Sequence, residues 1–166
     1  MPSHSYLAYR RNARAAAARQ VVKESKELEK YKKAQEDFAY FCEYVADKPP
    51  AKHHLEWHRH FITNEDSSCL LKIAGPNIDL LAPRGSAKST ILGLLTAWAI
   101  GVHTTAGKPL QILYLSYTVD IARSKSATIK RIIESKKYQQ VFPKVKLLKN
   151  VTSNEYWSID HKFAGI

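Results

Sequence analysis

Residues 78–91 read Ile-Asp-Leu-Leu-Ala-Pro-Arg-Gly-Ser-Ala-Lys-Ser-Thr-Ile, and they decide the fold that the sequence predicts. Residues 78–82 have little polarity and are typical of a buried strand, residues 83–87 of a tight loop, and Lys88 of the start of a helix. This order brings backbone N–H groups, a lysine ammonium and a hydroxyl to one place. Such groups bind the phosphates and the Mg²⁺ ion of a nucleoside triphosphate, so the stretch predicts a phosphate-binding loop, or P-loop.

The loop departs from the usual pattern G-x-x-x-x-G-K-[ST] at both glycine positions, which hold Ala82 and Ala87. Lys88 and Ser89 fit the pattern, and Gly85 keeps one glycine in the loop. The alternative is an ordinary strand-to-helix turn that happens to carry a basic residue. Lys88 at a helix N-terminus opposes the helix dipole unless an anion lies between them, which favours the phosphate interpretation.

The segments around the loop predict an α/β fold with a parallel sheet core. Residues 78–82 and 111–116 have the apolar composition of buried parallel strands. Residues 90–100 are apolar almost all round, as in a buried helix that Gly101 ends. Residues 118–136 have the apolar spacing of an amphipathic helix. Strand, loop, helix, strand and helix in this order imply a parallel sheet with right-handed crossovers.

The chain is expected to consist of two parts. Residues 1–46 form a basic N-terminal helical segment, and residues 26–45 within it have amphipathic spacing. Asp47-Lys48-Pro49-Pro50 ends that helix. Residues 47–166 form an incomplete P-loop domain in this prediction. Two further short strands are expected, at residues 145–148 and 156–159.

Three segments together resemble the N-terminal ATPase region of the large terminase subunit of tailed phages, the motor that packages DNA into proheads. They are Ala-Pro-Arg-Gly-Ser-Ala-Lys-Ser-Thr (82–90), Ile-Leu-Tyr-Leu-Ser-Tyr-Thr-Val-Asp-Ile-Ala (112–122) and Lys-Lys-Tyr-Gln-Gln-Val-Phe-Pro (136–143). The resemblance implies a P-loop NTPase fold, with ATP and Mg²⁺ as ligands. It also implies that the complete protein couples ATP hydrolysis to DNA translocation.

The resemblance assigns roles to the loop residues. Lys88 would contact the β- and γ-phosphates, and Ser89 would bind Mg²⁺. Arg84 stands early in the loop, where such terminases often have an arginine, and would sense or stabilise the γ-phosphate. Lys88 and Arg84 are therefore the candidate catalytic residues. The other residues expected to contact ATP in the loop are Pro83, Gly85, Ser86, Ala87 and Thr90.

The resemblance also implies partners and a location. The partners are double-stranded DNA, the small terminase subunit and the portal, and the complete protein would form a homo-oligomeric ring. The complete protein would be located in the cytoplasm of the host cell and would have no membrane as a partner. The sequence agrees, because no apolar run reaches transmembrane length and the first residues lack the apolar core of a signal peptide. Cys42 and Cys69 make no disulfide framework and are expected to be reduced thiols.

Trp57-His58 precedes the loop and resembles the aromatic-glutamine pair that recognises adenine in terminases and helicase-like ATPases, with histidine replacing glutamine. The resemblance therefore implies that both residues contact the base of ATP. Two alternatives stay open. One is a metal site, because His54 and His58 are four residues apart, with His60 and Cys69 nearby. The other is an amphipathic helix with histidines at its rim.

The net charge of +11 is concentrated in two regions. Residues 1–33 carry a net charge of +6 and residues 118–150 a net charge of +7. Clustered positive charge favours a polyanionic partner such as nucleic acid, with strongly salt-dependent binding. The alternative is that these charges only solvate exposed helix faces.

A P-loop motor also needs an apolar strand that ends in two acids, which bind Mg²⁺ and position the attacking water. The nearest approach after the loop is Ile159-Asp160, which lacks the second acid. The chain is therefore expected to be the front part of a motor, with ATP hydrolysis near background by itself and no nuclease domain. The alternatives are a non-catalytic basic module that binds nucleic acid, and a helicase-like or small P-loop NTPase such as a nucleotide kinase.

Overall fold

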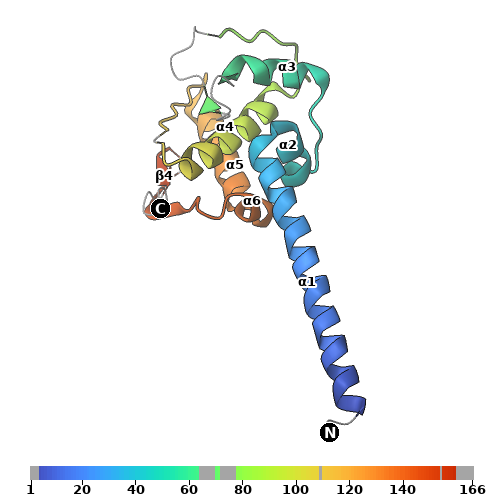
Figure 1. Cartoon of the computed structure of the whole chain (residues 1–166). Helices are drawn as coiled ribbons and strands as arrows, with labels where there is room; N and C mark the ends of the chain where they lie inside the picture. The colour runs from blue at the N-terminus through green and yellow to red at the C-terminus, as the bar shows by residue number, and fades with distance from the viewer. Residues whose placement is uncertain (1–3, 64–69, 72–77, 109, 154, 160–166) are drawn as a thin grey trace.

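The structure is a computed structural model, and it describes residues 4–63, 70–71, 78–108, 110–153 and 155–159 (Figure 1). Its helices are α1 (His4–Glu36), α2 (Phe38–Ala46), α3 (Lys52–Phe61), α4 (Lys88–Thr105), α5 (Val119–Glu134) and α6 (Lys136–Val141). Its strands are β1 (Ile62–Thr63), β2 (Leu70–Leu71), β3 (Leu147–Thr152) and β4 (Trp157–Ile159). Helices α2 to α6 form a helical body, and α1 projects from it as a long arm (Figure 1).

The predicted α/β fold with a parallel sheet core is wrong. The strands in the described residues form two separate antiparallel pairs, β1 with β2 and β3 with β4. Residues 78–82 and 111–117, which include both predicted parallel strands, form no backbone–backbone hydrogen bond with any described residue. A strand exists only when a second strand satisfies its N–H and C=O groups. These two segments therefore lack the ladder of backbone hydrogen bonds that defines a strand.

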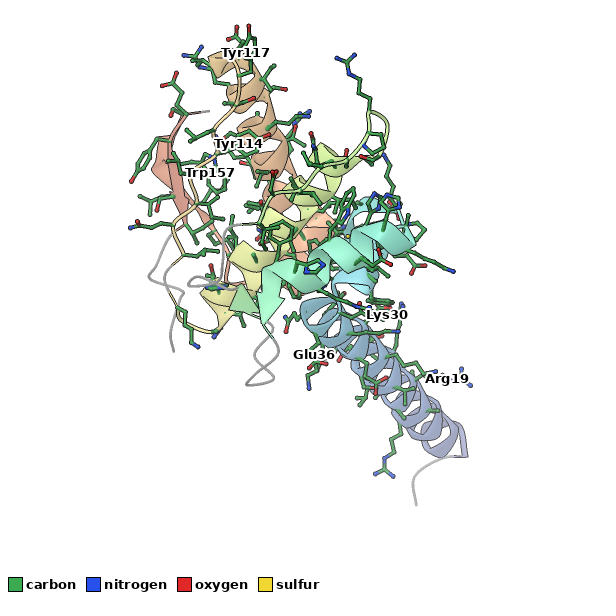
Figure 2. All side chains as sticks on the ribbon, turned by 90° about the horizontal axis from the view of Figure 1, so that it is seen from above. Arg19, Lys30, Glu36, Tyr114, Tyr117 and Trp157 are labelled. Carbon is green, nitrogen blue, oxygen red and sulfur yellow. The ribbon has the colours of Figure 1, made fainter. Side chains whose placement is uncertain are left out.

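The apolar side chains of these segments are exposed as well. Leu81 is 87% exposed, Leu113 is 81% exposed and Tyr117 is 97% exposed. Tyr114 and Tyr117 lie on the chain that leads into α5 (Figure 2). The composition that predicts a buried strand is therefore present, but no described layer covers it. The hydrophobic core is built between helices instead.

The core lies where α2, α4, α5 and α6 meet the C-terminal end of α1. Trp98 of α4 is buried and donates its indole N–H to the carbonyl of Ala34 at 3.1 Å. Tyr138 of α6 is also buried, and its hydroxyl donates to the carbonyl of Ala97 at 2.9 Å. Both polar groups of these large aromatic side chains are thus satisfied inside the core. The remaining large buried side chains of the core are Phe38, Phe41, Phe142, Ile133, Val141 and Val145.

The amphipathic helix predicted over residues 26–45 is two helices that Asp37 separates. Asp37 has extended backbone (φ −116°, ψ 110°), and its carboxylate accepts hydrogen bonds from the N–H groups of Ala39 and Tyr40 at 2.8 and 3.2 Å. This is the geometry of an N-cap, which starts a new helix. The boundary expected between residues 46 and 47 falls at the end of α2, whose Phe38 and Phe41 share one core with Trp98 of α4.

Gly101 does not end its helix, as the sequence suggested, because α4 continues to Thr105. The glycine is at this position because the ring of Phe142 lies directly on it. A Cβ atom at residue 101 would stand 2.5 Å from two ring carbons of Phe142. The absence of a side chain lets the segment after α6 pack closely against α4.

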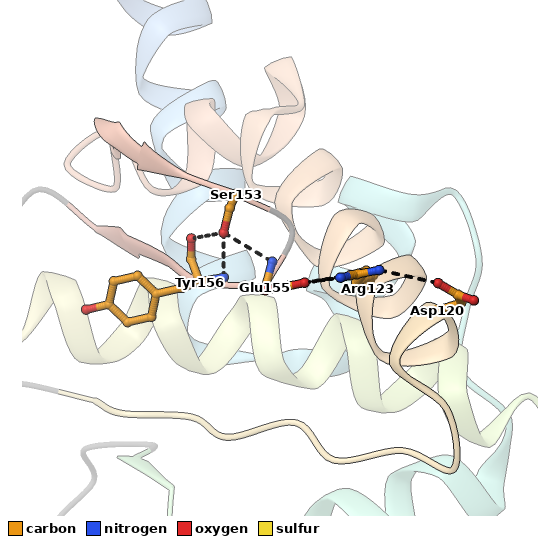
Figure 3. Close-up of polar contacts among 5 residues, drawn as sticks. All are labelled: Asp120, Arg123, Ser153, Glu155 and Tyr156. Atoms are coloured by element: carbon orange, nitrogen blue, oxygen red, sulfur yellow. Dashed lines mark hydrogen bonds and ion pairs between the residues drawn. The ribbon is translucent and has the colours of Figure 1, made fainter.

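The other expected elements are confirmed. Helices α4 and α5 contain most of the two predicted helices, and β3 and β4 form an antiparallel hairpin near residues 145–159. Trp157 donates its indole N–H to the hydroxyl of Ser126 at 2.8 Å, and Glu155 pairs with Arg123, which also lies 3.5 Å from Asp120. The contacts of Trp157 and Glu155 hold the hairpin against α5, and Figure 3 shows Glu155 beside Arg123 and Asp120.

Candidate phosphate-binding site

The loop before α4 has a backbone in which the sign of φ alternates. Gly85 has φ of 85° and Ala87 has φ of 54°, whereas Ser86 and Lys88 have negative φ. Alternation between left-handed and right-handed residues turns successive N–H groups toward one side, which makes a concave site for an anion. Ala87 holds the left-handed conformation without being glycine, at a cost of about 1–2 kcal/mol. The surrounding structure must therefore hold it there.

The N–H groups at the start of α4 are available to a ligand. Those of Thr90 and Ile91 donate to the carbonyl of Ala87 at 3.0 Å. Those of Ala87, Lys88 and Ser89 donate to no acceptor in the described part of the chain. Ala87 is the N-cap residue and has no side-chain oxygen to satisfy them. Three adjacent free donors at the positive end of an 18-residue helix favour an anion at this position.

The side chains at the loop are basic or hydroxyl-bearing. The Lys88 ammonium lies 3.4 Å from the carbonyl of Leu80 and makes no ion pair with any described carboxylate. Arg84 is exposed at the turn before Gly85. Ser89 is exposed in the first turn of α4. The loop residues that the sequence singled out, from Pro83 to Thr90, thus lie in one continuous stretch that ends in the first turn of α4.

A cavity of about 170 Å³ adjoins the start of α4. Ser89 and Thr90 line it, together with Lys48, which lies just after α2, and Lys125 of α5. The sequence did not predict these two lysines as site residues, because only the packing of other segments against α4 brings them to the cavity. The other residues that line the cavity are Ala46, Leu92, Gly93, Leu94, Thr96, Tyr114, Thr128, Ile129 and Ile132.

The structure does not place Trp57 and His58 on one surface. Trp57 is half-buried, and its ring centroid lies 5.0 Å from that of His53 and 5.2 Å from that of His54. His58 points into the helical body and stacks on Phe38 with 4.7 Å between ring centroids and 7° between planes. Consecutive helical residues point about 100° apart, which separates the two side chains. Trp57 lies on the side of α3 that includes His54.

No group of three or more potential metal ligands occurs in the described residues, and Cys69 lies outside them. His54 instead makes two hydrogen bonds to backbone groups. Cys42 is a buried free thiol, and burial raises its pKa to about 12, so it is neutral at physiological pH. Hydrogen bonding therefore accounts for His54, and burial in the core accounts for Cys42.

Half-buried His58 and buried His103 predict that the fold is less stable in acid. Burial lowers the pKa of His58 and of His103 below the ordinary value of 6.5. Because each pKa is lower in the folded than in the unfolded chain, the unfolded chain binds more protons, and stability falls as pH drops through 6.5. We expect the urea midpoint to be flat above about pH 7 and to fall below it. His58→Phe, which keeps the stack on Phe38, should make that fall shallower, and an unchanged pH profile would contradict this account.

Comparison with known protein families, with curated proteins and with solved structures gave no match. No helix in the described part of the chain combines the length and the apolar character that crossing a membrane requires. Function is therefore inferred from the chain's own residues and their geometry.

Proposed function

We propose that this chain binds the triphosphate of ATP, together with Mg²⁺, at the loop from Pro83 to Thr90. We further propose that it is the nucleotide-binding portion of a DNA-packaging motor of the terminase large-subunit kind, as the sequence resemblance implies. One observation carries the proposal: three N–H groups that have no acceptor among the described residues, and a lysine that pairs with no described carboxylate, meet at the start of α4. The N–H groups and the lysine all come from the loop and the first turn of α4, so the proposed site does not need a parallel sheet.

Each loop residue has a role in this proposal. The N–H groups of Ala87, Lys88 and Ser89 donate to phosphate oxygens. The Lys88 ammonium exchanges the neutral carbonyl of Leu80 for a phosphate, which gives a stronger, charge-assisted hydrogen bond. The Ser89 hydroxyl is a ligand of Mg²⁺, and Arg84 neutralises the γ-phosphate. Lys48 and Lys125 add positive potential at the cavity beside the helix start.

Binding without rapid turnover is the expected activity of this chain. No described carboxylate contacts Arg84, Lys88 or Ser89 through a hydrogen bond or an ion pair. Phosphoryl transfer to water needs an acidic group that binds the metal ion and orients the water. In a complete motor that group comes from residues other than those described.

A competition titration of the whole chain tests the proposal. We expect MgATP to bind saturably and inorganic triphosphate to displace it, because the polyphosphate supplies most of the contacts. If neither ligand binds at concentrations up to about 1 mM, where the binding free energy is only about −4 kcal/mol, the proposal is wrong.

Duplex DNA is the proposed macromolecular partner, and α1 is the element that supports it. The helix is 33 residues long, or about 50 Å, and no acidic residue precedes Glu24 in the chain. Arg14 and Arg19 are exposed on the part of α1 that projects from the body, and Figure 2 shows Arg19 there. A free, arginine-rich helix can reach phosphates that the compact body cannot.

Charge substitutions on α1 test the DNA contact. Replacing Arg14 and Arg19 with glutamine should weaken binding to a duplex and make the plot of log affinity against log salt shallower by about 2 between roughly 50 and 200 mM salt. The control replaces Lys52 and Lys136, two exposed lysines of the body, with glutamine. Equal losses from both pairs would show that α1 makes no particular contribution.

A further inference from the structure

His54 makes two hydrogen bonds that join α3 to the loop before α4. It is the third residue of α3, and it is only 7% exposed. Its Nδ1 lies 3.0 Å from the backbone nitrogen of Ala51, and its Nε2 lies 2.8 Å from the carbonyl oxygen of Ser86. The ring therefore connects two chain segments that are 32 residues apart in sequence.

The partners determine which ring nitrogen carries the proton. The Ala51 N–H can only donate, so Nδ1 of His54 must accept and cannot carry a proton. The Ser86 carbonyl can only accept, so Nε2 must carry the proton and donate it. The neutral imidazole with its proton on Nε2 satisfies both bonds. No other protonation state of the ring does so.

This second bond sets the direction of an N–H group in the loop. The Ser86 carbonyl and the Ala87 N–H belong to the same peptide unit, which is planar and trans, so they point in opposite directions. When His54 holds the Ser86 carbonyl toward α3, the Ala87 N–H must point away from α3. The same bond restrains the peptide plane that precedes Ala87, whose left-handed backbone needs such a restraint.

We infer that His54 is a positioning residue of the phosphate-binding loop: its Nε2–H fixes the Ser86–Ala87 peptide so that the Ala87 N–H faces the ligand. This inference rests on the proposed function, because it assigns the loop's shape to a residue of α3. The sequence pattern that defines a phosphate-binding loop does not include such a residue, since His54 lies 32 positions before Ser86.

A pair of uncharged variants separates positioning from a general structural role. In His54→Gln, the side-chain amide can accept from the Ala51 N–H, as the third residue of a capping box does, and can donate to the Ser86 carbonyl. His54→Met has a similar length and can do neither. Inorganic triphosphate affinity is measured for each variant. Backbone amide order parameters of the ligand-free proteins are measured by NMR at Gly85–Lys88, with Trp98 in the core of α4 as the internal control.

The expected result is that His54→Met binds triphosphate roughly five- to tenfold more weakly, which is the usual effect of one lost hydrogen bond, while His54→Gln stays near the wild type. Order parameters at Gly85–Lys88 should be lower in His54→Met, with that of Trp98 unchanged. If the wild type binds triphosphate and both variants bind it equally well, the inference is wrong. If the wild type binds none, the proposed function fails, and the order parameters at Gly85–Lys88 then decide alone whether His54 holds the loop: unchanged values in His54→Met overturn the inference.

Discussion

Gly101→Ala is expected to lower the free energy of unfolding by about 1–3 kcal/mol, which is the usual cost of overpacking a core. This is the opposite of the ordinary effect, since alanine inside a helix stabilises by about 0.5–1 kcal/mol relative to glycine. The reason is the ring of Phe142, whose carbons would lie 2.5 Å from the new Cβ atom. Phe142 is fully buried, so its ring has no free space into which it can move.

Gly93→Ala is the matched control for this prediction, because Gly93 lies in the same helix. A Cβ atom there would meet Cγ1 of Ile129 at 3.9 Å, an ordinary van der Waals contact. We expect this substitution to be neutral or to stabilise the protein by up to about 1 kcal/mol. Urea unfolding of both variants gives the comparison. The same sign and size of effect at both positions would contradict the packing of Phe142 on α4.

Lys88→Ala is expected to weaken ATP binding by about ten- to a hundredfold. A hydrogen bond to a charged group contributes about 1.5–3 kcal/mol, and each 1.4 kcal/mol changes the affinity tenfold. The loss should be at least as large for inorganic triphosphate as for ATP, because the proposed contact of the lysine is with phosphate rather than with the base. Isothermal titration at constant salt measures both affinities.

The control for Lys88→Ala is Lys108→Ala, which removes the same charge from an exposed lysine just after the other end of α4. Its effect on ATP affinity should be less than about twofold, since charges that far apart are largely screened at physiological salt. Equal losses in the two variants would mean that ATP responds only to net charge. The loop would then have no specific role.

The helices could be predicted from the sequence because their evidence is local. Apolar spacing in residues 118–136 and the continuous apolar run in residues 90–100 each specify a helix without reference to any other segment. The ends of these helices were less predictable. Gly101 suggested a helix end, but its actual role depends on Phe142, which lies about forty residues further along the chain.

The sheet could not be predicted reliably because a strand depends on a partner. Residues 78–82 and 111–116 have strand composition, but composition does not say whether another segment pairs with them. No described segment does, and the two stretches are extended and exposed. The order of strand, loop, helix, strand and helix implied a parallel sheet, and the described fold lacks it.

Some residues of the candidate site could be predicted from the sequence, and others could not. Lys88 and Ser89 could be named from the sequence because their spacing from the loop is fixed along the chain. Lys48 and Lys125 could not, because tertiary packing alone places them beside α4. The two hydrogen bonds of His54 could not be predicted from the sequence either, since a histidine in an amphipathic helix has many possible partners.

The proposed function depends on backbone N–H groups at the start of α4 that bind a polyphosphate. The most direct test follows the backbone amide resonances of the whole chain by NMR during titration with MgATP. We expect the resonances of Gly85, Ala87, Lys88 and Ser89 to shift saturably, with the same midpoint, and to shift much less in Lys88→Ala. If ATP binds while these four resonances stay in place, the phosphate is held elsewhere and the account of the loop is wrong.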